Sequence, residues 1–204
     1  MNKKTKVLLS ICAGIVAAAA ITGGLLFSQY TTQRASLLDV HDPKVVTTTI
    51  KEALMDSGAS ENTEVTLDQI KEVNGFCAVS FFSQNPEDEG PATNGLLLLE
   101  EADGPFEGLY YPEINMSGIS SSKLDGRALN FPEKGVTVCA VYGQKPEDAA
   151  ARYAFEQGGT YYSRAIPDGN FVDVFVLPSQ DKLEYSKSLT GFLLDEDGNE
   201  VGMF

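Results

Sequence analysis

The feature that most constrains this chain is an uncharged, strongly apolar run near its start. Residues 7–27, beginning with Val7 and ending with Phe27, contain no Asp, Glu, Lys or Arg. At about 1.5 Å per residue, a helix of this length measures about 31 Å, which matches the hydrocarbon core of a bilayer. The run therefore predicts a single transmembrane helix that anchors the protein in the cell membrane.

The basic residues around this run predict its orientation. Lys3, Lys4 and Lys6 directly precede it, whereas the first basic residue after it is Arg34. Because positively charged flanks stay on the cytoplasmic side, we expect residues 1–6 to form a short cytoplasmic N-terminus. The chain beyond the helix is then extracytoplasmic.

A cleaved signal peptide is the alternative interpretation. Ala18 and Ala20 form an A-x-A cleavage pattern, and cleavage near Ala20 would release a secreted protein. The apolar run nevertheless continues to Phe27, where a cleaved peptide would already have become polar, and this favours a retained anchor. Cys12 resembles the lipidated cysteine of bacterial lipoprotein signals only superficially, because the bulky Ile11 precedes it.

Beyond the anchor, the sequence divides into a polar stalk, residues 28–42, and one domain, residues 43–204. Of the 15 Lys and Arg, three precede the anchor; the remaining 12 accompany all 29 Asp and Glu, so the outer part carries a formal charge of −17. A field of this sign repels phosphate backbones and argues against a nucleic-acid partner. The domain is long enough, and rich enough in Phe, Tyr, Leu and Val, to form a hydrophobic core.

We expect this domain to be α+β and predominantly antiparallel β, with one N-terminal helix packed on the sheets. Asp42 and Pro43 are typical of an N-cap and a first helical residue, and the apolar stripe of Val46, Ile50 and Leu54 follows helical spacing until Gly58.

Strands separated by turn residues are predicted from Glu64 onward. Asn74-Gly75 predicts a hairpin turn, and the two strands of this hairpin together with the next two form a meander of about four strands. Residues 146–157 are ambiguous, and we expect a helical turn followed by a strand that pairs across Gly158-Gly159. The predicted strands include residues 76–82, 96–99, 106–111, 136–142, 160–166 and 171–177, with two more flanking residues 195–199; residues 117–122 are expected to be a loop.

The two halves of the domain share a short pattern. Cys-Ala-Val begins at Cys77 and again at Cys139, and each copy precedes a Gln-x-Pro-Glu-Asp segment. Paired tyrosines, Tyr110-Tyr111 and Tyr161-Tyr162, come later in each half. The pattern is compatible with a diverged duplication of a β unit of about 60 residues, and equally with chance recurrence of common strand and turn residues.

Cys77 and Cys139 also leave two structural alternatives open. Outside the cytoplasm an even pair of cysteines can form a disulfide. Each cysteine, however, lies in an apolar run typical of a buried strand, where a free thiol packs equally well.

The sequence assigns no catalytic, cofactor-binding or metal-binding residue. His41 is the only histidine, which argues against histidine-based zinc sites and Ser-His-Asp sites. Acidic runs such as Glu100-Glu101 and Asp195-Glu196-Asp197 place neighbouring carboxylates on opposite faces of a strand or in a turn. The Asp195 segment also departs from an EF-hand loop, because Gly198 is its fourth residue and not its sixth.

These observations favour an extracytoplasmic binding or accessory module without catalytic activity, held near the membrane, whose partner is a protein, a peptide or an envelope component. The Lys-rich start and Ala-rich span suit a bacterium. Two other functions stay open at this stage: an acid-dependent envelope hydrolase, which needs two convergent carboxylates, and a structural or assembly module, which needs a long exposed sheet edge.

Overall fold

The computed structural model describes residues 31–87, 92–112, 116–120, 123–146 and 149–204. The chain divides into two compact units, Met1–Leu37 and Leu38–Phe204. In the first unit, the described part contains a short helix over residues 31–35. The predicted anchor, residues 7–27, lies outside the described residues, and within them no helix is both long and apolar enough to cross a membrane.

The Leu38–Phe204 unit contains three antiparallel sheets of four strands each. Sheet 1 has the order β1 (Glu64–Val73), β2 (Phe76–Gln84), β3 (Thr93–Glu100), β4 (Met116–Ser120). Sheet 2 has the order β10 (Tyr185–Ser188), β5 (Leu124–Phe131), β6 (Val136–Gln144), β9 (Asn170–Pro178). Sheet 3 has the order β12 (Glu200–Met203), β11 (Gly191–Leu194), β7 (Arg152–Gln157), β8 (Thr160–Ala165). The prediction of a mostly antiparallel β fold with few helices is confirmed.

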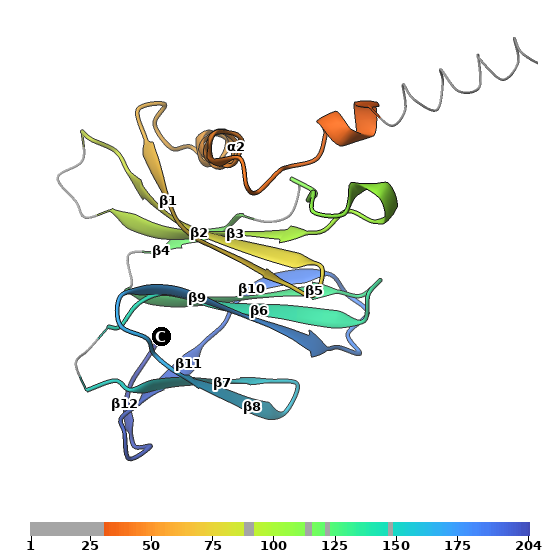
Figure 1. Ribbon diagram of the computed structural model, residues 1–204. Helices are drawn as coiled ribbons and strands as arrows, with labels where there is room; N and C mark the ends of the chain where they lie inside the picture. Colours follow the sequence, from red (N-terminus) through yellow and green to blue (C-terminus); the bar gives the residue numbers. More distant parts are fainter. Residues whose placement is uncertain (1–30, 88–91, 113–115, 121–122, 147–148) are drawn as a thin grey trace, which may run out of the picture. The chain divides into compact units, whose positions relative to one another are not determined.

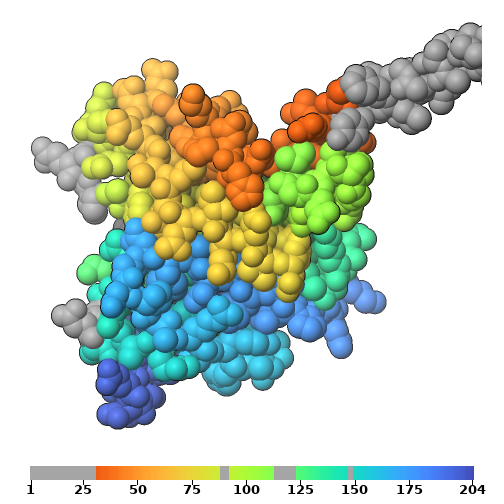
Figure 2. Space-filling view, viewed as in Figure 1, coloured from red at the N-terminus to blue at the C-terminus, as the bar shows by residue number. Residues whose placement is uncertain are grey.

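The helix α2 (Pro43–Asp56) and the three sheets form four stacked layers, with α2 on sheet 1, sheet 1 on sheet 2, and sheet 2 on sheet 3 (Figure 1). Figure 2 shows the same sequence of layers at the surface, from the orange α2 through the yellow strands of sheet 1 to the cyan and blue strands of the other two sheets. Sheets 1 and 2 are therefore covered on both faces.

A separate hydrophobic cluster fills each space between layers. The first joins Ile50 of α2 to Phe81 of sheet 1, and the second joins Leu98 of sheet 1 to Ala140 of sheet 2. The third contains Tyr153 and lies between sheets 2 and 3. Each large apolar side chain buried in this way contributes about 1.5–3 kcal/mol, so the stack depends on all three clusters.

The helix α2 begins where its sequence predicts. The side chain of Asp42 accepts hydrogen bonds from the backbone N–H groups of Lys44 and Val45, and Pro43 occupies the first turn. These contacts satisfy donors that the helix itself leaves unpaired. Burial of Val46, Ile50 and Leu54 against sheet 1 offsets the low helix propensity of the three consecutive threonines.

The compact unit begins earlier than residue 43, because part of the segment expected to be a stalk belongs to the core. Leu38 and Val40 are buried in the first cluster. The backbone of Leu38 exchanges two hydrogen bonds with Tyr110, at 2.7 and 2.9 Å. A strand over residues 106–111 was predicted, and this prediction is wrong, since the chain there forms a 3-10 turn, η1 (Gly104–Phe106), and two isolated bridges at Tyr110.

The fourth strand of sheet 1 is instead β4, which occupies most of the segment expected to be a loop. Its sequence, Met-Ser-Gly-Ile-Ser, lacks the apolar alternation that predicts a strand. The β7–β8 hairpin around Gly158 and Gly159 is confirmed, with Phe155 opposite Tyr162.

The two cysteines lie in different clusters. Cys77 is buried between α2 and sheet 1, and Cys139 is buried between sheets 2 and 3. Both thiols are free. Neighbouring strand residues face opposite ways, so Ala78 and Ala140 meet in the second cluster while the cysteine before each alanine points away from it.

The β1–β2 hairpin of sheet 1 and the β5–β6 hairpin of sheet 2 would be the equivalent parts of the proposed repeat, but β1 is an edge strand whereas β10 lies outside β5. The two halves differ in the path of the chain after these hairpins. After β2, the chain returns at once as β3 beside it, whereas after β6 it first forms β7 and β8 in sheet 3 and only then returns as β9. A duplication therefore stays a prediction.

Candidate functional site

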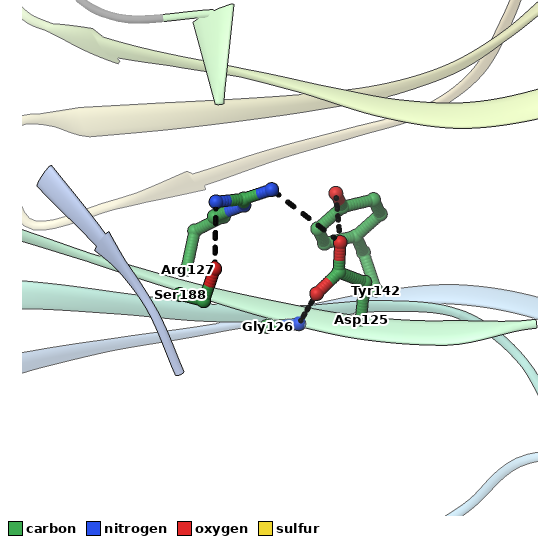
Figure 3. Close-up of polar contacts among 5 residues, drawn as sticks. All are labelled: Asp125, Gly126, Arg127, Tyr142 and Ser188. Carbon is green, nitrogen blue, oxygen red and sulfur yellow. Dashed lines mark hydrogen bonds and ion pairs between the residues drawn. The ribbon is translucent and has the colours of Figure 1, made fainter. Parts of the chain in front are cut away.

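A polar cluster lies on the face of sheet 2 that packs toward sheet 1 (Figure 3). Asp125 and Arg127 project from β5, Tyr142 from β6, and Ser188 from β10. The Asp125 carboxylate accepts hydrogen bonds from the Tyr142 hydroxyl at 3.2 Å and from the Gly126 backbone N–H at 2.7 Å. The Arg127 guanidinium lies 3.7 Å from the same carboxylate and donates to the Ser188 hydroxyl at 2.9 Å.

In this cluster the positive charge of Arg127 compensates the negative charge of Asp125. Burial raises the pKa of the Tyr142 phenol far above its usual range, so the hydroxyl stays protonated and acts as a donor. Both oxygens of Asp125 already accept hydrogen bonds. The Nε atom of Arg127 is buried and has no hydrogen-bond partner in the described part of the chain. We assign the cluster to charge compensation between strands.

A second polar network joins sheet 1 to sheet 2 at a β-bulge in β1, where the register with β2 shifts beside Asp68. The Asp68 carboxylate accepts hydrogen bonds from the Ser80 hydroxyl at 3.1 Å and from the Asn170 side chain at 2.8 Å. The Gln69 amide donates to the Asn170 carbonyl at 2.6 Å. These bonds tie the edge strands β1 and β9 together.

An open groove of about 560 Å³ lies between the β7–β8 turn and the C-terminal end of β9. These two ends lie at the same side of the stack (Figure 1). Tyr162 and Leu177 contribute apolar surface that continues into the third cluster. Its polar lining consists of Gln157, Thr160, Ser179, Gln180 and Asp181.

Hydrogen bonds hold the polar groups of the groove in place. The Gln157 amide donates to the Tyr185 hydroxyl at 3.3 Å, and that hydroxyl donates to the Asp181 carboxylate at 3.3 Å. Three elements, β7, β10 and the loop after β9, are thereby connected. Gly158 and Gly159 have positive φ angles of 60° and 76°, which a two-residue hairpin loop of this kind requires.

The wall formed by β8 is fixed to β9 through Asp173. One carboxylate oxygen accepts a hydrogen bond from the buried Tyr153 hydroxyl at 2.6 Å, and the other pairs with Arg164 at 2.9 Å. The Arg164 guanidinium also lies over the Phe175 ring, 4.3 Å from its centroid. Sheets 2 and 3 therefore cannot separate without breaking this buried polar contact.

The residues considered in the sequence analysis do not converge. His41 is exposed and its Nε2 lies 3.1 Å from Glu72. Glu100 pairs with Lys134 at 2.6 Å, and Glu101 accepts a hydrogen bond from the Gly108 backbone N–H at 2.7 Å. Within the described ranges, no group of three or more His, Cys, Asp or Glu is placed to hold a metal ion.

The acidic segment near the C-terminus forms the turn between β11 and β12. The side-chain amide and backbone N–H of Asn199 donate to the Asp195 carboxylate at 3.0 and 2.8 Å. These hydrogen bonds lower the pKa of Asp195. A general acid needs a shift in the opposite direction.

Because side chains alternate between the two faces of a strand, the sequence predicts that one tyrosine of each pair faces the core. Tyr110 is buried and Tyr111 is exposed, while Tyr162 is half-buried and Tyr161 is exposed. Asn115-Met116-Ser117 matches the glycosylation sequon, and Asn115 lies outside the described residues. The sequence singles out Tyr162 only as a member of a tyrosine pair. It indicates none of the other groove residues, since they come from separate strands and share no spacing that could indicate a site.

Comparison of the chain with protein-family models, with curated proteins and with solved structures finds no match.

Proposed function

We propose that the protein is a membrane-anchored extracytoplasmic binding module without catalytic activity, and that the groove between the β7–β8 turn and the end of β9 is its binding site. The observation that carries this proposal is the groove itself. Its volume of about 560 Å³ lies within the range of about 300–1,000 Å³ typical of ligand sites. Its lining combines an aromatic ring with amides, hydroxyls and one carboxylate.

The composition of the groove favours binding over chemistry. Among the described residues, the only charged side chain in its lining is Asp181, and none of the lining side chains is a histidine, cysteine or lysine. A hydrolase of the glycosidase type needs two carboxyl groups about 5–10 Å apart around its substrate. A single carboxylate that accepts a hydrogen bond from Tyr185 is better suited to holding a ligand.

The location of the module is inferred from the sequence. The uncharged residues 7–27 and the preceding lysines support an anchor with its N-terminus in the cytoplasm. The formal charge of −17 beyond the anchor supports a solvent-facing domain that does not approach anionic phosphate surfaces. Cleavage near Ala20 and secretion is the alternative location.

The location is tested by sequencing the mature N-terminus from membrane and soluble fractions. An intact terminus found only in the membrane fraction, and resistant to alkaline extraction, supports the anchor. A chain that begins near Ile21 and is recovered outside the cell contradicts it.

The site is tested by photo-crosslinking in intact cells. A photoreactive residue replaces Thr160 in the groove, and the matched control replaces Glu52 on the exposed side of α2. We expect adducts at position 160 and none at position 52. Equal labelling at both positions, or none at position 160, would refute the groove as the binding site.

A further inference from the structure

We propose that the groove binds a neutral saccharide, a short oligosaccharide of uncharged hexose or N-acetylhexosamine units. This inference rests on the proposed function, because it names the ligand class of the same site. Three properties of the lining point to this class: its charge, its aromatic platform, and its set of hydrogen-bonding groups.

The charge of the groove argues against anionic ligands. No Lys or Arg of the described ranges lines it, and its one charged side chain there, Asp181, is negative. The outer part of the chain adds a field of −17 formal charges. Phosphorylated, sulfated and carboxylated ligands would enter this site without a compensating cation, which is unfavourable.

The aromatic platform is the ring of Tyr162. One side of the ring is stacked on Phe155, with centroids 5.4 Å apart and an interplanar angle of 25°. Phe175 packs against it at a centroid distance of 6.1 Å and an angle of 60°. β8 is the edge strand of sheet 3, and the half-buried Tyr162 lines the groove. A fixed aromatic face with a polar rim suits the apolar C–H face of a sugar ring.

The polar groups match the hydroxyls of a sugar. Gln157 and Gln180 offer amides, Thr160 and Ser179 offer hydroxyls, and Asp181 offers a carboxylate. Amides and hydroxyls both donate and accept, as the neighbouring hydroxyls of a saccharide do. The Gln157–Tyr185–Asp181 chain of hydrogen bonds keeps two of these groups in position before a ligand arrives, which reduces the entropy lost on binding.

An extended peptide added to the free edge of β8 is the competing occupant. Such a peptide would be held by backbone hydrogen bonds along the whole edge strand. The affinity for such a peptide would therefore depend little on the groove side chains, which lie at the start of β8 and around the end of β9. The two ligand classes thus respond differently to side-chain substitutions.

The test uses the full chain in lipid nanodiscs, because maltoside and glucoside detergents carry the sugars that are being tested. The protein is first screened against immobilised neutral, amino and acidic oligosaccharides, together with basic and acidic peptides. Isothermal titration then gives the Kd of the best neutral oligosaccharide. We expect binding of neutral saccharides, with no binding of acidic ones.

Four variants relate that binding to the groove. Y162A should weaken binding by about tenfold or more, while Y162F, which keeps the ring, should retain it within about threefold. The matched control Y161A changes a neighbouring exposed ring on the same strand and should leave binding unchanged. T160W fills the groove from an exposed position and should abolish binding, and it keeps the test valid if Y162A fails to fold.

The outcomes separate this inference from the proposed function. Groove-dependent saccharide binding supports both. A different outcome is that crosslinks form at position 160 in cells but no neutral saccharide binds at about 10 mM. This result would refute the saccharide as the ligand class and would still support the groove as the binding site. Saccharide binding that survives T160W overturns the site assignment, and peptide binding that survives all four variants assigns the occupant to the β8 edge.

Discussion

The replacement Y153F tests a buried polar contact that joins sheets 2 and 3. Tyr153 is fully buried, and its hydroxyl donates to the Asp173 carboxylate at 2.6 Å. Burial is the largest cause that raises the pKa of this phenol far above its usual range, so the hydroxyl remains a donor. Phenylalanine keeps the ring contacts with Phe171 and Phe204, both at centroid distances of 6.0 Å, and removes only the donor.

The loss of stability expected for Y153F follows from the type of hydrogen bond that is removed. A hydrogen bond to a charged acceptor contributes about 1.5–3 kcal/mol. Asp173 keeps its pairing with Arg164, and its side chain is 20% exposed, so water can replace part of the lost bond. We therefore expect the free energy of unfolding to fall by about 2 kcal/mol. For a domain of this size, the melting temperature should fall by about 4–8 °C.

Urea unfolding of the full chain measures this loss as a lower midpoint with an unchanged m-value. The matched control Y161F removes a hydroxyl from an exposed side chain and should change stability by less than about 0.5 kcal/mol. A double-mutant cycle with D173N should give a coupling energy above about 1 kcal/mol. Equal effects of Y153F and Y161F, or additive effects in the cycle, would contradict the assigned contact.

Three further predictions concern the cores of the stack. Burial raises the pKa of the Cys77 and Cys139 thiols from 9.0 to about 12, so the unfolded chain ionises at a lower pH than the folded one. The stability that this difference provides should be fully present below pH 9 and should fall by about 1 kcal/mol per thiol for each pH unit as the pH rises towards 12. Urea midpoints measured against pH should decline less steeply in the C77A/C139A variant. A Cβ at Gly95 would overlap the ring of Phe81, so G95A should lower stability by about 1–3 kcal/mol and F81L should relieve part of that loss in the double variant. I50A opens a cavity between α2 and sheet 1 and should cost about 2–5 kcal/mol in calorimetry; a smaller loss would mean that α2 packs loosely.

Local patterns were sufficient for most elements of the fold. Asp42-Pro43 and a stripe of buried residues predicted α2, because capping and helical spacing act within a few residues. Asn74-Gly75 and Gly158-Gly159 predicted hairpin turns because their positive φ angles suit these residues. The long apolar runs of β2 and β6 are explained by burial on both faces.

Contacts between segments that are distant in the sequence could not be predicted from local patterns. The pairing of Tyr110 with Leu38 replaced a predicted strand, since the backbone groups of Tyr110 found partners far away in the sequence. The place of β4 in sheet 1 depends on its neighbour β3 and not on its own weak pattern. The separation of the two cysteines depends on which face of each sheet is covered.

The sequence by itself determined the apolar run of residues 7–27, the acidity of the outer part, the helix α2, most strands, and the alternation within the tyrosine pairs. Each of these follows from composition or from spacing along one segment. Only the tertiary structure decided that three sheets stack, that Cys77 and Cys139 belong to separate clusters, and that Tyr162 and Asp181 line one groove. The physical reason is that burial, pairing and cavities arise where separate strands meet, and the free energy of those contacts depends on residues that the chain brings together only when it folds.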